Sequence, residues 1–85
     1  MNFGEALEQL KRENPVRRAG WNGKGMNIYL EDSLRFTVKA TKTTRGLDRV
    51  YEPVICLFTA QGKHQPGWVP SQADMLADDW ELVNT

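Results

Sequence analysis

The stretch VRRAGWNGKGMNIYL, residues 16–30, predicts the first unit of the sheet. Residues 16–19 look extended, and residues 26–30 alternate between apolar and other side chains, as a strand with one apolar face does. Between them, Asn22 and Gly23 are a strong signal for a type I′ turn. We therefore expect a β-hairpin, with enough glycine around the turn to allow a longer connecting loop.

The residues before the hairpin predict a short helix. Asn2 is followed three positions later by Glu5, which is the spacing of a capping box. Apolar residues then recur near the helical period, and Pro15 closes the segment. An amphipathic helix over residues 3–13 is expected.

Further strands are expected after the hairpin. Residues 34–40 alternate in the manner of a strand with one wet face. The run VICLF, residues 54–58, is apolar on both faces and predicts a central strand that is covered on both sides. A turn at residues 60–63 leads to a short strand ending near residues 68–69, and residues 80–83 alternate well enough to form a last strand.

Two other segments complete the prediction. Residues 41–49 are polar and basic without apolar rhythm, which indicates a mobile or a functional loop. Residues 70–77 predict a second helix, with Ser71 as its N-cap and Asp74 at the reciprocal position. The fold class is therefore α+β: an antiparallel sheet of about four or five strands, one N-terminal helix packed on it, and a short second helix. We expect a single ligand-binding domain over residues 1–85.

Composition excludes several classes of function. The 85 residues carry 11 basic and 11 acidic side chains, so the net charge of zero gives no electrostatic footprint for DNA or an anionic membrane. No apolar run approaches the roughly 20 residues that span a bilayer, and the N-terminus does not read as a signal peptide, so we expect a cytoplasmic protein. A chain this short buries only about 60–65% of its unfolded surface, and oligomerisation is the expected supplement.

Residues with catalytic chemistry are scarce. Cys56 and His64 are the only cysteine and the only histidine, which leaves no disulfide and no metal-ligand cluster. Cys56 lies in an apolar strand and is expected in the core, and His64 lies among turn residues as a surface side chain. Asp78 and Asp79 read as a solvated helix end more readily than as Mg²⁺ ligands. We expect no catalytic residue, no metal and no cofactor, and a protein that is not an enzyme.

Three tryptophans are the more suggestive feature. Trp80 belongs to an alternating strand and is expected in the core. Trp21 and Trp68 each follow a glycine in a turn-like context, where an exposed indole is a stacking platform for a base. Arg17 or Arg18 would hold a phosphate, and only one can face the site because neighbours on a strand point opposite ways. The competing interpretation is that both turn tryptophans close the ends of the sheet or lie in an oligomer interface.

Four blocks of the chain together resemble a known family: NFGEAL, VRRAGWNGKGM, YEPVICLFTAQG and WVPSQADMLADDWELV. In this order and spacing they are similar to the phage-encoded Thoeris anti-defence protein two family. The resemblance implies a sponge that sequesters a cyclic ADP-ribose isomer, glycocyclic ADP-ribose, made by the bacterial Thoeris TIR enzyme. It also implies a homotetramer with ligand pockets at contacts between protomers, and in some members separate sites for cyclic dinucleotides.

Carried onto this sequence, the resemblance implies a small cyclic-nucleotide site built from the hairpin turn and the second helix. One of the turn tryptophans would stack on adenine, an arginine would pair with the pyrophosphate, and polar side chains would bind ribose hydroxyls or the adenine edge. The residues concerned are Arg18, Trp21, Asn22, Gly23, Met26, Trp68, Pro70, Ser71, Gln72, Asp74 and Met75. Residues 41–49 match none of the four blocks.

Two rival hypotheses remain. In the first, a phage module binds single-stranded nucleic acid, with the tryptophans stacking on unpaired bases and a basic segment tracking phosphates. That segment contains Arg35, Lys39, Lys42, Arg45 and Arg49 against the single acid Asp48. The zero net charge of the chain argues against it, so nucleic acid is an unexpected partner. In the second, the protein is an enzyme that hydrolyses the signal, which the scarcity of nucleophiles disfavours.

Overall fold

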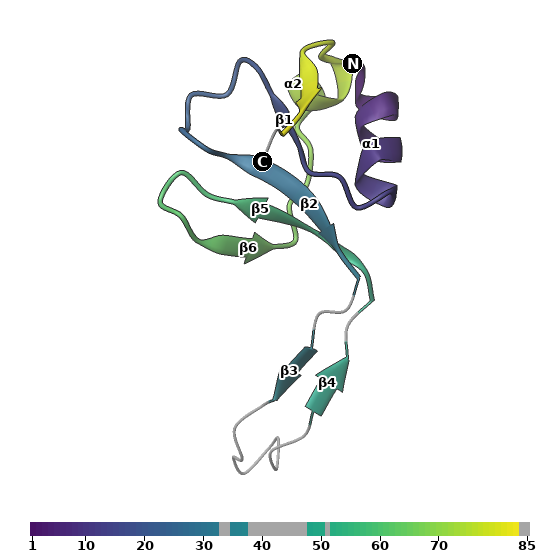
Figure 1. The fold of residues 1–85 in the computed structure, drawn as a ribbon, viewed down its shortest axis with the longest axis vertical. Helices are drawn as coiled ribbons and strands as arrows, with labels where there is room; N and C mark the ends of the chain where they lie inside the picture. Colours follow the sequence, from purple (N-terminus) through teal and green to yellow (C-terminus); the bar gives the residue numbers. More distant parts are fainter. Residues whose placement is uncertain (33–34, 38–47, 51, 84–85) are drawn as a thin grey trace.

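The computed structural model describes residues 1–32, 35–37, 48–50 and 52–83 and has the predicted α+β architecture (Figure 1). A five-stranded antiparallel sheet has the order β6-β5-β2-β1-β7, and β3 and β4 form a separate two-stranded hairpin beyond the ends of β2 and β5. In chain order the elements are α1 (Phe3–Lys11), β1 (Val16–Arg18), β2 (Asn27–Glu31), β3 (Arg35–Thr37), β4 (Asp48–Val50), β5 (Val54–Phe58), β6 (His64–Pro66), α2 (Gln72–Leu76) and β7 (Trp80–Leu82).

Helix α1 begins with the predicted capping box. The Asn2 side chain accepts a hydrogen bond from the Glu5 amide at 2.8 Å, and the Glu5 carboxylate accepts one from the Asn2 amide at 3.0 Å. Each bond satisfies an amide that has no partner within the helix. Two residues of this helix, Ala6 and Leu10, are fully buried and anchor it to the sheet.

The helix ends at Lys11, two residues before the predicted end at Glu13. Glu13 has a φ of 65°, and this left-handed backbone reverses the chain. The Glu13 amide donates to the Leu10 carbonyl and the Asn14 amide donates to the Gln9 carbonyl, both at 2.9 Å. This pair of bonds is a Schellman motif, formed here around a residue other than the usual glycine.

One face of the sheet carries the core. The register places Val16 opposite both Ile28 and Leu82, and Ile28 opposite Leu57. Directly paired residues project to the same side of a sheet, so these residues share one face. Helix α1 covers that face, where its buried residues cluster with Val16, Ile28 and Trp80. The opposite face carries no helix among the described residues.

The connection between β1 and β2 is not the predicted type I′ turn. That turn requires positive φ at two successive residues, yet in this loop only Gly25 has one, at 78°. The Met26 amide donates to the Gly23 carbonyl at 3.2 Å and closes the turn there. Nearer β1, the Ala19 amide donates to the Asp79 carbonyl at 2.9 Å. Bonds to another strand therefore shape this loop, and it is longer and more irregular than a two-residue turn.

The middle of the chain agrees with the prediction in part. The strand expected over residues 34–40 is found as β3, whose register pairs Phe36 with Arg49 of β4. The predicted end of the loop over residues 41–49 is therefore wrong, because residues 48–49 pair with β3 and belong to a strand. The remaining residues of both predictions lie outside the described part of the chain.

Strand β5 is central in the sheet but is not covered on both faces. It lies between β2 and β6, and only Cys56 among its five residues is buried. Cys56 is the cross-strand neighbour of Tyr29, whose side chain covers it in place of a helix. Strand β6 ends at Pro66, earlier than predicted, because Gly67 takes a φ of 89° and the chain leaves the sheet.

Candidate ligand-binding site

The three tryptophans meet on the core face of the sheet and form what we call the tryptophan cluster (Trp21, Trp68 and Trp80). Their ring centroids are separated by 5.4 Å between Trp21 and Trp80, 6.2 Å between Trp68 and Trp80, and 6.3 Å between Trp21 and Trp68. All three pairs are edge-on, the favoured geometry for aromatic contacts. Trp80 is only 2% exposed, which confirms it as a core residue, and the other two are half-buried against it.

Helix α2 is fixed beside this cluster by its own N-terminus. The Ser71 hydroxyl accepts a hydrogen bond from the Asp74 amide at 3.1 Å, and the Asp74 carboxylate accepts one from the Ser71 amide at 3.0 Å. The predicted capping box is thus confirmed. The indole Nε1 of Trp80 donates to the Asp74 carbonyl at 2.9 Å and ties the helix to the buried ring. A helix of five residues with none of them buried depends on such side-chain contacts.

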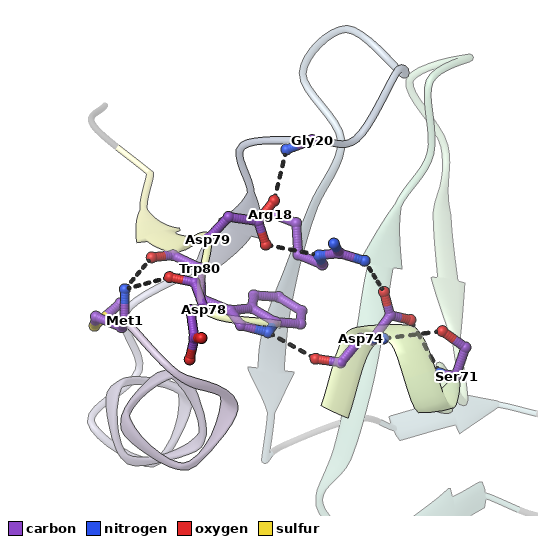
Figure 2. Close-up of polar contacts among 8 residues, drawn as sticks. All are labelled: Met1, Arg18, Gly20, Ser71, Asp74, Asp78, Asp79 and Trp80. Atoms are coloured by element: carbon purple, nitrogen blue, oxygen red, sulfur yellow. Dashed lines mark hydrogen bonds and ion pairs between the residues drawn. The ribbon is translucent and has the colours of Figure 1, made fainter. Parts of the chain in front are cut away.

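Arg18 joins three segments of the chain through one guanidinium group (Figure 2). Its Nε donates to Asp79 Oδ1 at 2.9 Å, and its Nη1 donates to Asp74 Oδ1 at 3.0 Å. Asp79 Oδ2 in turn accepts the Gly20 amide at 3.0 Å. We call Arg18, Asp74 and Asp79 the Arg18 network. It connects β1 and the following loop with α2 and the start of β7.

The charges of the Arg18 network are mutually adjusted. The hydrogen bonds that Arg18 donates to Asp79 and then to Asp74 raise its pKa above the ordinary arginine value, against the opposing effect of burial. The hydrogen bond from Arg18 is the main cause that lowers the pKa of Asp79 below 3.8. Burial acts to raise the pKa of Asp74, but hydrogen bonds from Ser71 and Arg18 outweigh it, and the net shift is downward. Two carboxylates around one guanidinium leave the network with one net negative charge.

This network predicts a loss of stability in acid. A carboxyl whose pKa is lowered by folding stabilises the folded state fully above its unfolded pKa, and that contribution is lost as pH falls through the folded value. The free energy of unfolding should therefore decline as pH falls below about 4, and urea unfolding over that range would measure it. A double variant with Asp74→Asn and Asp79→Asn should show a shallower decline. Equal slopes for the two proteins would contradict this account.

The structure also separates the two neighbouring arginines. Arg18 lies opposite Trp80 in the β1–β7 register, on the core face, where it reaches α2. Arg17 lies opposite Glu81 on the other face, and its Nε donates to Glu81 Oε1 at 2.9 Å. Of the two, Arg18 is therefore the one beside the other predicted site residues.

The remaining predicted residues lie at different distances from this centre. Arg18, Trp21, Trp68, Ser71 and Asp74 are joined by the contacts above. Gly23 packs closely against the Met26 side chain. A Cβ added at Gly23 would overlap that side chain and lie 3.0 Å from Ala60 Cβ. That contact turns them toward the β5–β6 connection. Of the other predicted residues, Asn22 lies in the β1–β2 loop, Pro70 lies just before α2, and Gln72 and Met75 lie within α2.

Two participants were missed from the sequence. Asp79 was read as a solvated helix end, but α2 ends earlier, at Leu76, and Asp79 accepts bonds from both Arg18 and Gly20. The sequence did contain the pair Arg17-Arg18 and the acids Asp79 and Glu81 around the start of β7. These residues become partners only once β1 and β7 are paired in register. The other missed participant is the Gly20 amide itself.

Neither a metal-ligand cluster nor a membrane-spanning helix is found in the described part of the chain. Within residues 1–32, 35–37, 48–50 and 52–83, no group of three His, Cys, Asp or Glu side chains is placed to hold a metal ion. No described helix is both long enough and apolar enough to cross a bilayer. Cys56 is buried as predicted.

Comparison with known proteins gives two matches along nearly the whole chain. The family model described as the Thoeris anti-defense 2-like domain matches residues 1–83. A protein of Bacillus phage SP01 named "Thoeris anti-defense 2" is 44% identical over 89 aligned positions, which cover 99% of this chain and 96% of the phage protein.

Proposed function

Since the chain belongs to the Thoeris anti-defense 2-like family, we propose that it is a phage anti-defence protein that binds and sequesters a cyclic ADP-ribose isomer, glycocyclic ADP-ribose, without degrading it. The protein then acts in the host bacterial cytoplasm, where the Thoeris TIR enzyme makes this signal. Cyclic dinucleotides are a further class of ligand in this proposal.

One observation carries the proposal: the Arg18 network and the tryptophan cluster fix the β1–β2 loop against α2. A sponge needs a site that is already formed before the ligand arrives, because ordering on binding costs affinity. Half-buried indoles beside hydrogen-bonding side chains are suited to a nucleotide.

The negative charge of the Arg18 network is a reason to propose that a second protomer contributes to the site. Arg18 is already paired with two carboxylates, so its network repels a pyrophosphate more than it attracts one. Arg18 then acts as a positioning residue, and the groups that hold the phosphates come from elsewhere. Nanomolar binding requires about −12 kcal/mol, whereas one stacking contact supplies roughly 1–3 kcal/mol. We therefore propose that contacts from two chains complete the site.

The surface around α2 supports assembly at this place. Val69, Met75 and Leu76 are 79%, 46% and 80% exposed, and they lie immediately around the Ser71–Asp74 capping box. These three exposed apolar side chains lie within eight consecutive residues of the chain, and exposed apolar patches commonly mark interfaces. We propose a homotetramer in which this surface lies at a contact between protomers and the ligand binds beside it.

A thermal-shift measurement tests the proposed function. Glycocyclic ADP-ribose at 100 times its Kd should stabilise the folded chain by about 2.7 kcal/mol, which for a domain of this size raises Tm by about 10–20 °C. Other cyclic ADP-ribose isomers and cyclic dinucleotides serve as comparisons. After heat denaturation of the complex, chromatography should return the ligand unaltered. No shift with any of these ligands would contradict binding, and a linear product would contradict sequestration without degradation.

A further inference from the structure

The second face of the sheet carries a depression that the proposed function does not use. Its volume is about 330 Å³, and it is lined by Asn27, Tyr29, Phe58 and His64. These residues come from β2, β5 and β6, which lie side by side in Figure 1. The register places Phe58 opposite both Asn27 and His64, so these three form one row across the strands. We call this feature the aromatic depression.

Its walls are rings held at fixed angles to one another. The Tyr29 hydroxyl lies 2.6 Å from His64 Nδ1 in a hydrogen bond, with the two rings edge-on at a centroid distance of 5.7 Å. The ring centroids of Phe58 and His64 lie 5.1 Å apart, with an interplanar angle of 57°. Cys56, the register partner of Tyr29 on this face, is buried. Burial, followed by the neighbouring Cys56, raises the pKa of Tyr29, so its hydroxyl keeps its proton at neutral pH.

The aromatic depression also offers hydrogen-bonding groups at its edge. Because Nδ1 of His64 is engaged by Tyr29, the second ring nitrogen, Nε2, is the one available to a ligand. It donates or accepts according to the tautomer that the Tyr29 bond selects. Asn27 donates its side-chain NH₂ to the Gly25 carbonyl at 3.0 Å, which leaves its amide oxygen as an acceptor. An imidazole nitrogen and an amide oxygen thus accompany the aromatic walls.

We propose that the aromatic depression is a second ligand-binding site, which takes a single planar aromatic heterocycle with both a donor and an acceptor on its edge, such as a nucleobase. Its volume lies near the lower limit of small-molecule pockets, which suits one ring system and not a whole dinucleotide. Aromatic faces bind a base by stacking, and hydrogen-bonding groups at the rim orient its edge. The site lies on the opposite face of the sheet from the tryptophan cluster and stands independently of the function proposed for that cluster.

Titration of the ¹⁵N-labelled full chain with adenosine tests this site. The amides of Asn27, Phe58 and His64 should shift in a saturable way with a Kd in the millimolar range or below, and free ribose should shift none of them. His64→Ala, at an exposed position, should weaken adenosine binding about ten-fold because it removes both a wall and the hydrogen-bonding nitrogen at the edge. Gln65→Ala is the matched control, since Gln65 is also exposed in β6 but faces the other way, and it should bind adenosine unchanged.

Three results would overturn the proposal. In the first, none of the three amides responds to adenosine. In the second, the amides of Trp21 and Asp74 respond instead, which would place the nucleoside in the tryptophan cluster. In the third, the same amides shift with protein concentration alone, and adenosine does not compete. That result would assign the aromatic depression to a second copy of the chain.

Discussion

Trp80→Ala is expected to lower the free energy of unfolding by about 3–5 kcal/mol, a large share of the total for a chain of this length. Trp80 is 2% exposed, and its ring lies against Phe3 at 5.5 Å as well as against Trp21 and Trp68. Truncating a buried tryptophan costs about 3–5 kcal/mol, while a chain of this length has a total stability of about 4–13 kcal/mol. The variant also removes the donor to the Asp74 carbonyl and releases the side chain that holds α2.

Urea unfolding followed by circular dichroism, at one fixed protein concentration, measures this loss. Gln61→Ala is the control, because Gln61 is exposed in the turn between β5 and β6 and its truncation should change the free energy of unfolding by less than about 0.5 kcal/mol. An unfolding midpoint for Trp80→Ala close to that of the unmodified chain would show that the tryptophan cluster is not the centre of the core.

Arg18→Gln is expected to weaken binding of glycocyclic ADP-ribose by about ten-fold or more, with the fold retained, since it removes charge-assisted bonds. The glutamine cannot bridge Asp74 and Asp79 as the guanidinium does, so α2 and the loop around Gly20 lose their common anchor. The two carboxylates are then left facing each other without a cation. The ligand would meet a site that is both less ordered and more negative.

The neighbouring residue provides the matched control. Arg17→Gln also breaks an arginine–carboxylate pair of 2.9 Å on the same strand, but on the other face of the sheet. Its affinity, measured by isothermal titration, should stay within about two-fold of the unmodified chain, because exposed ion pairs contribute little. Equal losses for the two variants would mean that the Arg18 network does not position the site.

Local signals in the sequence predicted the parts of this fold that local chemistry decides. Both capping boxes were read correctly, because the bonds of each span only three residues. Strand periodicity likewise located β2, β5 and β7, and the apolar Trp80 was correctly assigned to the core. Each of these features depends on neighbours in the chain more than on the final arrangement of the sheet.

The errors occur where distant residues decide. Asn22-Gly23 has the chemistry of a type I′ turn, yet Asp79 binds the Gly20 amide and draws the loop toward β7. Asp79 is separated from Arg18 by 61 positions, so their pairing cannot be read before the register of β1 and β7 is known. For Trp21 the sequence left two interpretations open, an exposed stacking platform and a side chain that closes the end of the sheet; its edge-on packing against Trp80 also depends on residues distant in the chain.

The pairing of β1 with β7 also decides when the proposed ligand site forms during folding (Figure 2). Joining Arg18 to Asp79 closes a loop of roughly sixty residues, and the entropy of loop closure must be overcome before those contacts stabilise anything. Contacts of such long sequence separation slow folding and tend to form after the local ones. We therefore expect the helices and the β2–β5 pair to form first and the Arg18 network last, so that under the proposed function a newly made chain would bind no ligand until β1 has paired with β7.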